Sequence, residues 1–224
     1  MSAPATHEAP FCGVTSAIAS GARSHDYGRG IGPTPRSWIA LGDSFTAGTG
    51  DDPARGGWAR RAGDELRTAG VLDVAVNHAE PGVAIQHVID HQLPLLAGRH
   101  WCVSVIAGAN DLLAPRCDAR VLAERVDVLL DACLDHAEVL LTSTCPDFFA
   151  QRSTRLARLS ARVDALNDHV RRRAAADPRI EVIDAHARLA DPALWSDDGL
   201  HPDPDGHAAL AELACAALAA RASG

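Results

Sequence analysis

Short apolar runs alternate with longer amphipathic stretches along most of the chain. Runs of four to seven apolar residues without strict alternation are typical of strands that are buried on both faces of a parallel sheet. Five such runs predict strands at Trp38–Leu41, Val71–Val76, Trp101–Ala107, Glu138–Thr144 and Ile180–Ile183.

The stretches between these runs carry apolar residues at helical spacing. One of them places apolar side chains on a single face through steps of three and four residues, with arginines on the opposite face: Leu156, Leu159, Val163, Leu166 and Val170. Alternating strands and helices indicate a parallel sheet, because parallel neighbours need crossover connections. The predicted fold class is α/β, as a single three-layer α/β/α sandwich.

The first 37 residues differ from the rest. They are rich in Gly, Pro, Ser, Ala and His and show no apolar periodicity, which is typical of a flexible or loosely packed extension. The pattern therefore predicts an N-terminal extension at residues 1–37 and one domain at residues 38–224. A domain of that size can bury a core without disulfides or a structural metal.

Composition excludes several classes of function. The formal net charge of -8 argues against a nucleic-acid partner, which would require a basic face. The chain contains no lysine, which removes Schiff-base chemistry, pyridoxal phosphate attachment and the P-loop. No apolar run approaches the roughly 18 residues of a membrane span.

The cysteines indicate the compartment. The chain has six, none of them in a C-x-x-C pair, and most lie in apolar segments where cysteine behaves as a small hydrophobe. A reducing compartment, the cytoplasm, is the simpler interpretation. Secretion is the minority alternative, since the apolar run from Phe11 to Ala22 is interrupted by polar residues and lacks a basic n-region.

A candidate nucleophile follows the first predicted strand. In open parallel sheets the active site lies at the carboxyl ends of the strands. Ser44 stands there in the segment Gly42-Asp43-Ser44, where the glycine permits a tight turn. A serine hydroxyl needs a base within hydrogen-bond reach, and the base must be held in the right tautomer by a third group.

Both of these further groups occur near the C-terminus. His201 is the candidate base, and Asp198, three residues earlier, is the candidate carboxylate that orients it. One loop can present both side chains to the same cleft. Asp197 competes with Asp198 for this role.

Acyl transfer also needs donors for the oxyanion of the tetrahedral intermediate. Three candidates follow predicted strands: the backbone N–H of Ser44, the backbone N–H of Gly82 and the side-chain amide of Asn110. We expect these donors to meet at the edge of the sheet that carries Ser44.

Two further carboxylates stand beside the candidate site. Asp43 and Asp111 are expected to hold loops through backbone hydrogen bonds rather than to act as acids. His87 and His91 are four residues apart on a predicted helix, but no third metal ligand is evident, so a surface position is expected and neither a metal nor a cofactor is predicted.

The role of several other residues stays open. His207 is expected to begin the last helix as a surface or packing residue. Phe148 and Phe149 follow the fourth strand, where they either line an acyl pocket or pack in the core, and Trp195 has the same two interpretations.

Four separated blocks together resemble the SGNH or GDSL hydrolase family. They are Gly42-Asp43-Ser44-Phe45, Asn77 to Gly82, Gly108-Ala109-Asn110-Asp111 and Asp198-Gly199-Leu200-His201, in the family's order. The resemblance implies a flavodoxin-like sheet with strand order 2-1-3-4-5, ester hydrolysis, and catalytic roles for Ser44, Gly82, Asn110, Asp198 and His201. The chain departs from the family pattern at Phe45, which replaces leucine, and at Pro81, which restricts Glu80.

The predicted function is therefore a serine-dependent ester hydrolase that acts on small or medium acyl esters through an acyl-enzyme. A small-molecule ester is the expected partner. An acyltransferase that uses an alcohol acceptor is the alternative, and a non-catalytic binding module is a third reading. The sequence gives no indication of the oligomeric state.

Overall fold

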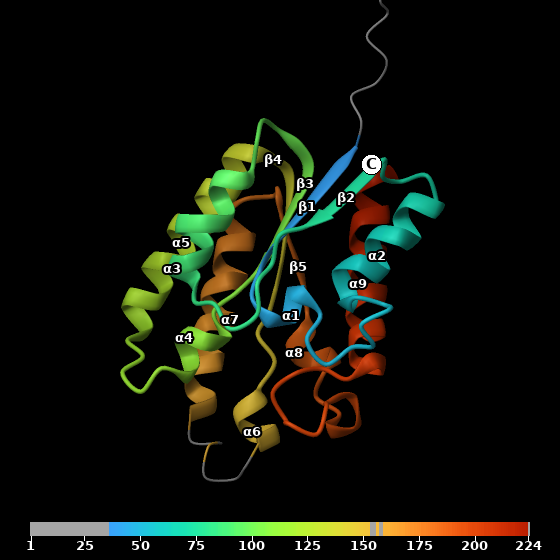
Figure 1. Cartoon of the computed structure of the whole chain (residues 1–224). Helices are drawn as coiled ribbons and strands as arrows, with labels where there is room; N and C mark the ends of the chain where they lie inside the picture. Colours follow the sequence, from blue (N-terminus) through green and yellow to red (C-terminus); the bar gives the residue numbers. More distant parts are fainter. Residues whose placement is uncertain (1–35, 153–155, 157–158, 224) are drawn as a thin grey trace, which may run out of the picture. The chain divides into compact units, whose positions relative to one another are not determined.

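The domain is built on a five-stranded parallel sheet (Figure 1). The structure is a computed structural model that describes residues 36–152, 156 and 159–223. Residues 1–35 of the expected N-terminal extension lie outside the described residues. The strands are ordered β2-β1-β3-β4-β5 and every pairing is parallel. Their bounds are β1 Ser37–Gly42, β2 Val74–Asn77, β3 His100–Ile106, β4 Ala137–Ser143 and β5 Ile180–Ile183.

Helices cover both faces of the sheet. Figure 1 shows α3, α5 and α7 on one side and α2 and α9 on the other. The α-helices are α1 Ser44–Ala47, α2 Gly57–Thr68, α3 Ile85–His87, α4 Ala109–Leu113, α5 Ala119–His136, α6 Phe148–Arg152, α7 Ser160–Ala176, α8 Ala185–Arg188 and α9 Pro204–Ser223. Shorter turns are the π-helix η1 at Val88–Gln92 and the 3-10 helices η2 at Leu93–Leu95 and η4 at Pro192–Leu194. The three-layer α/β/α fold and the 2-1-3-4-5 strand order are confirmed.

The second strand differs most from its prediction. It spans Val74–Asn77 instead of Val71–Val76, and it lies at the edge of the sheet. Val71 instead closes the turn after α2, its N–H donating to the carbonyl of Leu66. Val74 and Val76 are 45% and 37% exposed, so the expectation of a fully buried strand was wrong here. An edge strand has a partner on one side only, and the apolar pattern does not reveal which strand that is.

The helix predicted from residues 156–170 is α7, but it begins only at Ser160. Val163, Leu166 and Val170 are buried against the core as the spacing predicts. Leu156 and Leu159 precede the helix and are partly buried. The apolar periodicity therefore extends beyond the helix itself.

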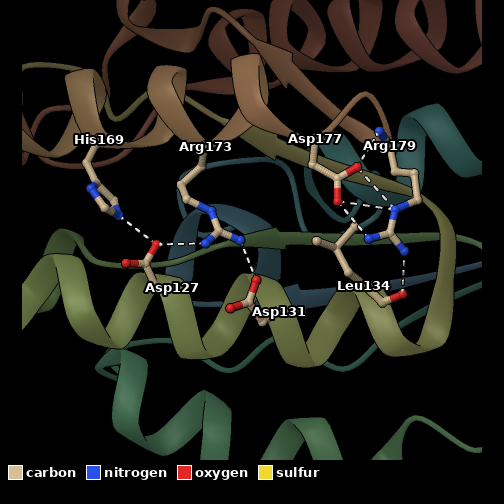
Figure 2. Close-up of polar contacts among 7 residues, drawn as sticks. All are labelled: Asp127, Asp131, Leu134, His169, Arg173, Asp177 and Arg179. Atoms are coloured by element: carbon tan, nitrogen blue, oxygen red, sulfur yellow. Dashed lines mark hydrogen bonds and ion pairs between the residues drawn. The ribbon is translucent and has the colours of Figure 1, made fainter.

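Helices α5 and α7 are also joined by charged side chains (Figure 2). Asp127 of α5 accepts from the Nε2 of His169 at 2.9 Å and lies 3.3 Å from the Nη1 of Arg173. Arg173 also pairs with Asp131 one turn further along α5. These groups are partly exposed, and such pairs typically contribute about 0.2–1 kcal/mol each. Apolar burial therefore dominates the packing of these two helices.

Within the described residues, the helices offer no segment that is both long enough and apolar enough to cross a bilayer.

The core can be tested at the centre of β4. Leu140 is fully buried, so Leu140→Ala should lower the free energy of unfolding by about 2–5 kcal/mol. Leu95→Ala makes the same substitution at a side chain that is 51% exposed and should cost far less. Urea unfolding followed by circular dichroism measures both. Equal losses would contradict the assignment of Leu140 to the core.

Candidate active site

The turn after β1 places Ser44 at the carboxyl edge of the sheet. Gly42 has φ +142°, and a Cβ at this position would lie 2.1 Å from the carbonyl oxygen of Ile106 on β3. Only glycine therefore allows the two strands to approach this closely. Asp43 then caps α1 by accepting from the N–H of Phe45 at 3.1 Å. Ser44 is the first residue of that helix and is 7% exposed.

Ser44 and His201 are in hydrogen-bond contact although 157 positions separate them. The Oγ of Ser44 lies 2.9 Å from the Nε2 of His201. The Nδ1 of the same ring lies 2.7 Å from the Oδ2 of Asp198. A carboxylate can only accept, so Nδ1 carries the proton, and in the neutral ring Nε2 accepts from the serine hydroxyl. The three side chains therefore form a continuous hydrogen-bonded line.

The Asp198 carboxylate is held by its own loop. Its Oδ1 accepts from the N–H of Leu200 at 2.7 Å, the N–H of His201 at 3.0 Å and the hydroxyl of Ser196 at 2.9 Å. Partial burial acts to raise its pKa, but the hydrogen bonds from His201, Leu200 and Ser196 outweigh burial and keep the pKa well below its usual range. The carboxylate in contact with the histidine is that of Asp198 and not that of its neighbour Asp197.

Asn110, in the first turn of α4, is tied to the loop that carries Gly82. The Nδ2 of Asn110 donates to the carbonyl of Val83 at 2.8 Å, and the N–H of Ile85 donates to the Oδ2 of Asp111 at 2.9 Å. Gly82 lies just before these contacts with φ +79°. The second amide hydrogen of Asn110 remains available to a ligand, since the amide has two donors.

Asp43 and Asp111 both hold loops. Asp111 is nearly buried, and besides the N–H of Ile85 it contacts Arg125 of α5 at 3.4 Å. Asp43 is 1% exposed, and burial raises its pKa from 3.8 to about 7 despite the backbone hydrogen bonds from Phe45, Ala109 and Gly108 that lower it. Asp43 thus connects the turn that carries Ser44 with the turn that carries Asn110.

Aromatic rings pack around the histidine. Phe45 lies 6.2 Å from the His201 ring and 6.4 Å from Trp195, in the latter case edge to face. Trp195 is buried and donates from Nε1 to the carbonyl of Leu189 at 2.8 Å. Phe148 and Phe149 are also buried, with ring centroids 4.5 Å apart. The structure therefore favours core packing for both of these phenylalanines and for Trp195.

The other histidines take different positions. His207 lies inside α9 rather than at its first residue, and it is fully buried. Its Nδ1 accepts from the N–H of Trp58 at 3.3 Å, and its Nε2 lies 2.9 Å from the carbonyl oxygen of Thr49, so it holds the segment after α1. Burial lowers its pKa. The rings of His87 and His91 lie next to each other, with centroids 4.4 Å apart and planes tilted by 45°.

Sequence reasoning did not single out two polar residues at this edge of the sheet. Ser196 supports Asp198, as described above. Asn167 of α7 accepts from the N–H of Cys145 at 2.6 Å and donates to its carbonyl at 2.9 Å, just after β4. An asparagine within an amphipathic helix carries no signal of this role; only its position on the apolar face, next to Leu166, hints at a buried amide.

Residues 40–209 match the GDSL-like lipase/acylhydrolase family. The chain belongs to this family. The match spans the strand end that carries Ser44 and the loop that carries Asp198 and His201. The recognition of a GDSL-type hydrolase and the prediction of an enzyme that cleaves esters are therefore confirmed. The chain matches no curated protein sequence.

Solved structures with this fold include other GDSL proteins. A member of the lipolytic G-D-S-L family from Veillonella parvula has a TM-score of 0.67 at 20% identity, over 80% of this chain and 96% of that one. A lipase/acylhydrolase from Enterococcus faecalis has a TM-score of 0.66 at 23% identity, over 83% and 96%. An acetylxylan esterase from Geobacillus stearothermophilus has a TM-score of 0.63 at 15% identity, over 82% and 94%. At these identities the likeness shows the shared fold.

The Asp43 carboxyl should make the stability of this GDSL-like enzyme depend on pH. Because burial raises its pKa, the folded chain binds this proton more tightly than the unfolded chain, so the free energy of unfolding falls as pH rises from 3.8 to about 7. At about 1.4 kcal/mol per pKa unit, the fall is on the order of 4 kcal/mol. Asp43→Asn keeps a capping oxygen and should remove most of this slope in urea unfolding series.

The control is Asp118→Asn, which makes the same change at the exposed cap of α5, where Asp118 accepts from the N–H groups of Arg120 and Val121. An unaltered slope in Asp43→Asn would show that the Asp43 carboxyl is not the source.

Proposed function

We propose that this chain is a serine-dependent esterase that acts on small or medium acyl esters through an acyl-enzyme. The observation that carries the proposal is the hydrogen-bonded line from Asp198 through His201 to Ser44, with contacts of 2.7 and 2.9 Å. This arrangement supplies the nucleophile, base and orienting carboxylate that acyl transfer requires.

In the proposed reaction, the Oγ of Ser44 attacks the ester carbonyl carbon while the Nε2 of His201 takes its proton. Asp198 stabilises the resulting imidazolium and keeps the ring in place. The tetrahedral intermediate collapses as His201 gives the proton to the leaving alcohol, which departs and leaves the acyl-enzyme. His201 then takes a proton from water as the water oxygen attacks the acyl carbon. The second tetrahedral intermediate collapses as His201 returns this proton to the Oγ of Ser44, which releases the carboxylic acid and restores the serine.

Three donors stabilise the oxyanion in this proposal: the N–H of Ser44, the N–H of Gly82 and the side-chain amide of Asn110. The N–H of Ser44 is at the first position of α1, where no intrahelical acceptor exists. The contact between Asn110 and Val83 supports the arrangement, because it holds the amide beside the loop that carries Gly82. Losing one such donor typically costs about 3–4 kcal/mol of transition-state stabilisation.

A small apolar cavity borders sequence neighbours of Ser44 and Asn110, and we propose it as the acyl pocket. It has a volume of about 40 Å³, and its lining includes Asp43, Phe45 and Ala109, the neighbours of Ser44 and Asn110 in the sequence. Val126, Leu130 and Leu166 are among its further walls. A space this small suits a short acyl chain better than a long one. The acetylxylan esterase with the same fold is a neighbour whose name specifies an acetyl ester.

The cysteines bear on the compartment. The five cysteines in the described part of the chain are free thiols, which supports the proposal of a reducing compartment, the cytoplasm. A small-molecule ester is the proposed partner.

Ser44→Ala should abolish turnover of p-nitrophenyl acetate without unfolding the protein, because only one oxygen is lost. A fluorophosphonate probe should label Ser44 in the folded wild type, as peptide mass mapping can show, and His201→Ala should greatly slow this labelling. Ser223→Ala, at the far end of α9, is the matched serine control and should behave as wild type. A wild type that neither turns over esters nor reacts with the probe would favour a non-catalytic binding module instead.

Hydrolysis and acyl transfer can be separated by product analysis. The acyl-enzyme is expected to partition toward water, so added methanol or glycerol should yield mainly the free acid from a p-nitrophenyl ester. The acyl group is expected to be short, so kcat/KM should fall from acetyl and butyryl esters to octanoyl and longer ones. Dominant formation of a new ester would point to the acyltransferase alternative.

A further inference from the structure

Gln92 is a fully buried amide that the proposed chemistry does not use. It is the last residue of the π-helical turn η1, and its side chain is 0% exposed. Burial of a carboxamide is costly unless its donors and acceptor find partners. π-helical turns are rare and occur frequently at functional sites.

Both ends of this amide bind the backbone of one residue of β1, Gly42. The Oε1 of Gln92 accepts from the N–H of Gly42 at 2.8 Å, and its Nε2 donates to the carbonyl of Gly42 at 2.9 Å. This two-bond pattern is the one a neighbouring strand would offer. It occurs where β2 has ended, since the register of β1 with β2 stops at Ala40 and Asn77. The Gln92 side chain thus completes the sheet at the last residue of β1.

Gly42 joins the turn that carries Ser44 to the loop that carries Gly82. Its carbonyl also accepts from the N–H of Glu80 at 3.1 Å, two residues before Gly82. On the opposite side, β3 pairs with it through Ile106, which accepts from the N–H of Asp43 at 3.1 Å. A shift of the Gly42 peptide would therefore move Ser44 and Gly82 together.

We propose that Gln92 is a positioning residue for the esterase reaction, which sets the distance between the Ser44 hydroxyl and the oxyanion donors by clamping the backbone of Gly42 through its N–H and its carbonyl. The inference rests on the proposed function. Gln92 contacts backbone only and takes no part in proton transfer. Its loss should therefore lower kcat and leave substrate affinity nearly intact.

Gln92→Met retains the length of the side chain and removes both hydrogen bonds. Because a displacement near 1 Å can cost about a hundredfold in rate, kcat for p-nitrophenyl acetate should fall about 10- to 100-fold, with KM changed less than about twofold. Gln86→Met makes the same change six residues earlier, where the exposed amide donates only to Asp90, and should behave as wild type. Wild-type kcat in a folded Gln92→Met protein would overturn the proposal.

Gln92→Glu removes only the hydrogen bond that the Nε2 of Gln92 donates to the carbonyl of Gly42. It remains decisive if Gln92→Met does not fold. A carboxylate can accept from the N–H of Gly42 but repels its carbonyl, whereas the protonated acid restores both bonds. The ratio of kcat in Gln92→Glu to kcat in wild type should therefore rise as pH falls from 8 to 5. Asp43, Glu80, His91 and His201 are the same in both proteins, so their effects largely cancel in the ratio. A flat ratio would contradict the clamp.

Amide exchange separates this inference from the proposed function. Hydrogen–deuterium exchange of a peptide covering residues 38–47 should be faster in Gln92→Met than in Gln86→Met, whether or not the protein cleaves esters. Faster exchange together with an inactive wild type would support the positioning role of Gln92 and contradict the proposed esterase function. Unchanged exchange together with an active wild type would contradict the positioning role of Gln92 and support the proposed esterase function.

Discussion

The close pairing of β1 with β3 at Gly42 is the constraint on which the site depends. A single Cβ at this position would collide with the carbonyl of Ile106 at 2.1 Å. Because the strands meet so tightly, the turn bearing Ser44 and the turn bearing Asn110 leave the sheet side by side. Asp43 then bonds across the gap to the backbone of Gly108 and Ala109. Proximity of the two turns therefore arises from the sheet.

Amide side chains reinforce this edge at two separate strands. Gln92 hydrogen-bonds to the N–H and the carbonyl of Gly42 at the end of β1. Asn167 does the same with the N–H and the carbonyl of Cys145 after β4. Each takes one N–H and one carbonyl that a regular strand neighbour would otherwise satisfy. The rigid platform below the catalytic loops is thus built partly from side chains that come from helical segments.

Much of this architecture could be predicted from the sequence, because parallel strands and amphipathic helices leave strong apolar patterns. The contacts of His201 with Ser44 and Asp198 could be predicted, because each of these residues stands in a short motif at a strand end or in a tight loop. The exposed face of β2 was missed, since the apolar pattern of Val71–Val76 does not distinguish an edge strand from a central one. Gln92, Asn167 and the burial of His207 were missed because their partners are backbone groups far along the chain.

Asp198 and His201 occupy one short loop, whereas Ser44 begins α1 just after β1. The loop is braced from within, by Ser196 and by the backbone of residues 200 and 201. It contacts the turn after β1 through the Ser44–His201 hydrogen bond and through Phe45, which packs against His201 and Trp195. The proposed base and its orienting carboxylate therefore form one unit whose contacts lie within a single short loop. A displacement of this segment would lengthen the distance from His201 to the Ser44 hydroxyl but leave the contact between His201 and Asp198 intact. Heating is therefore expected to reduce activity at a lower temperature than the one at which the domain unfolds.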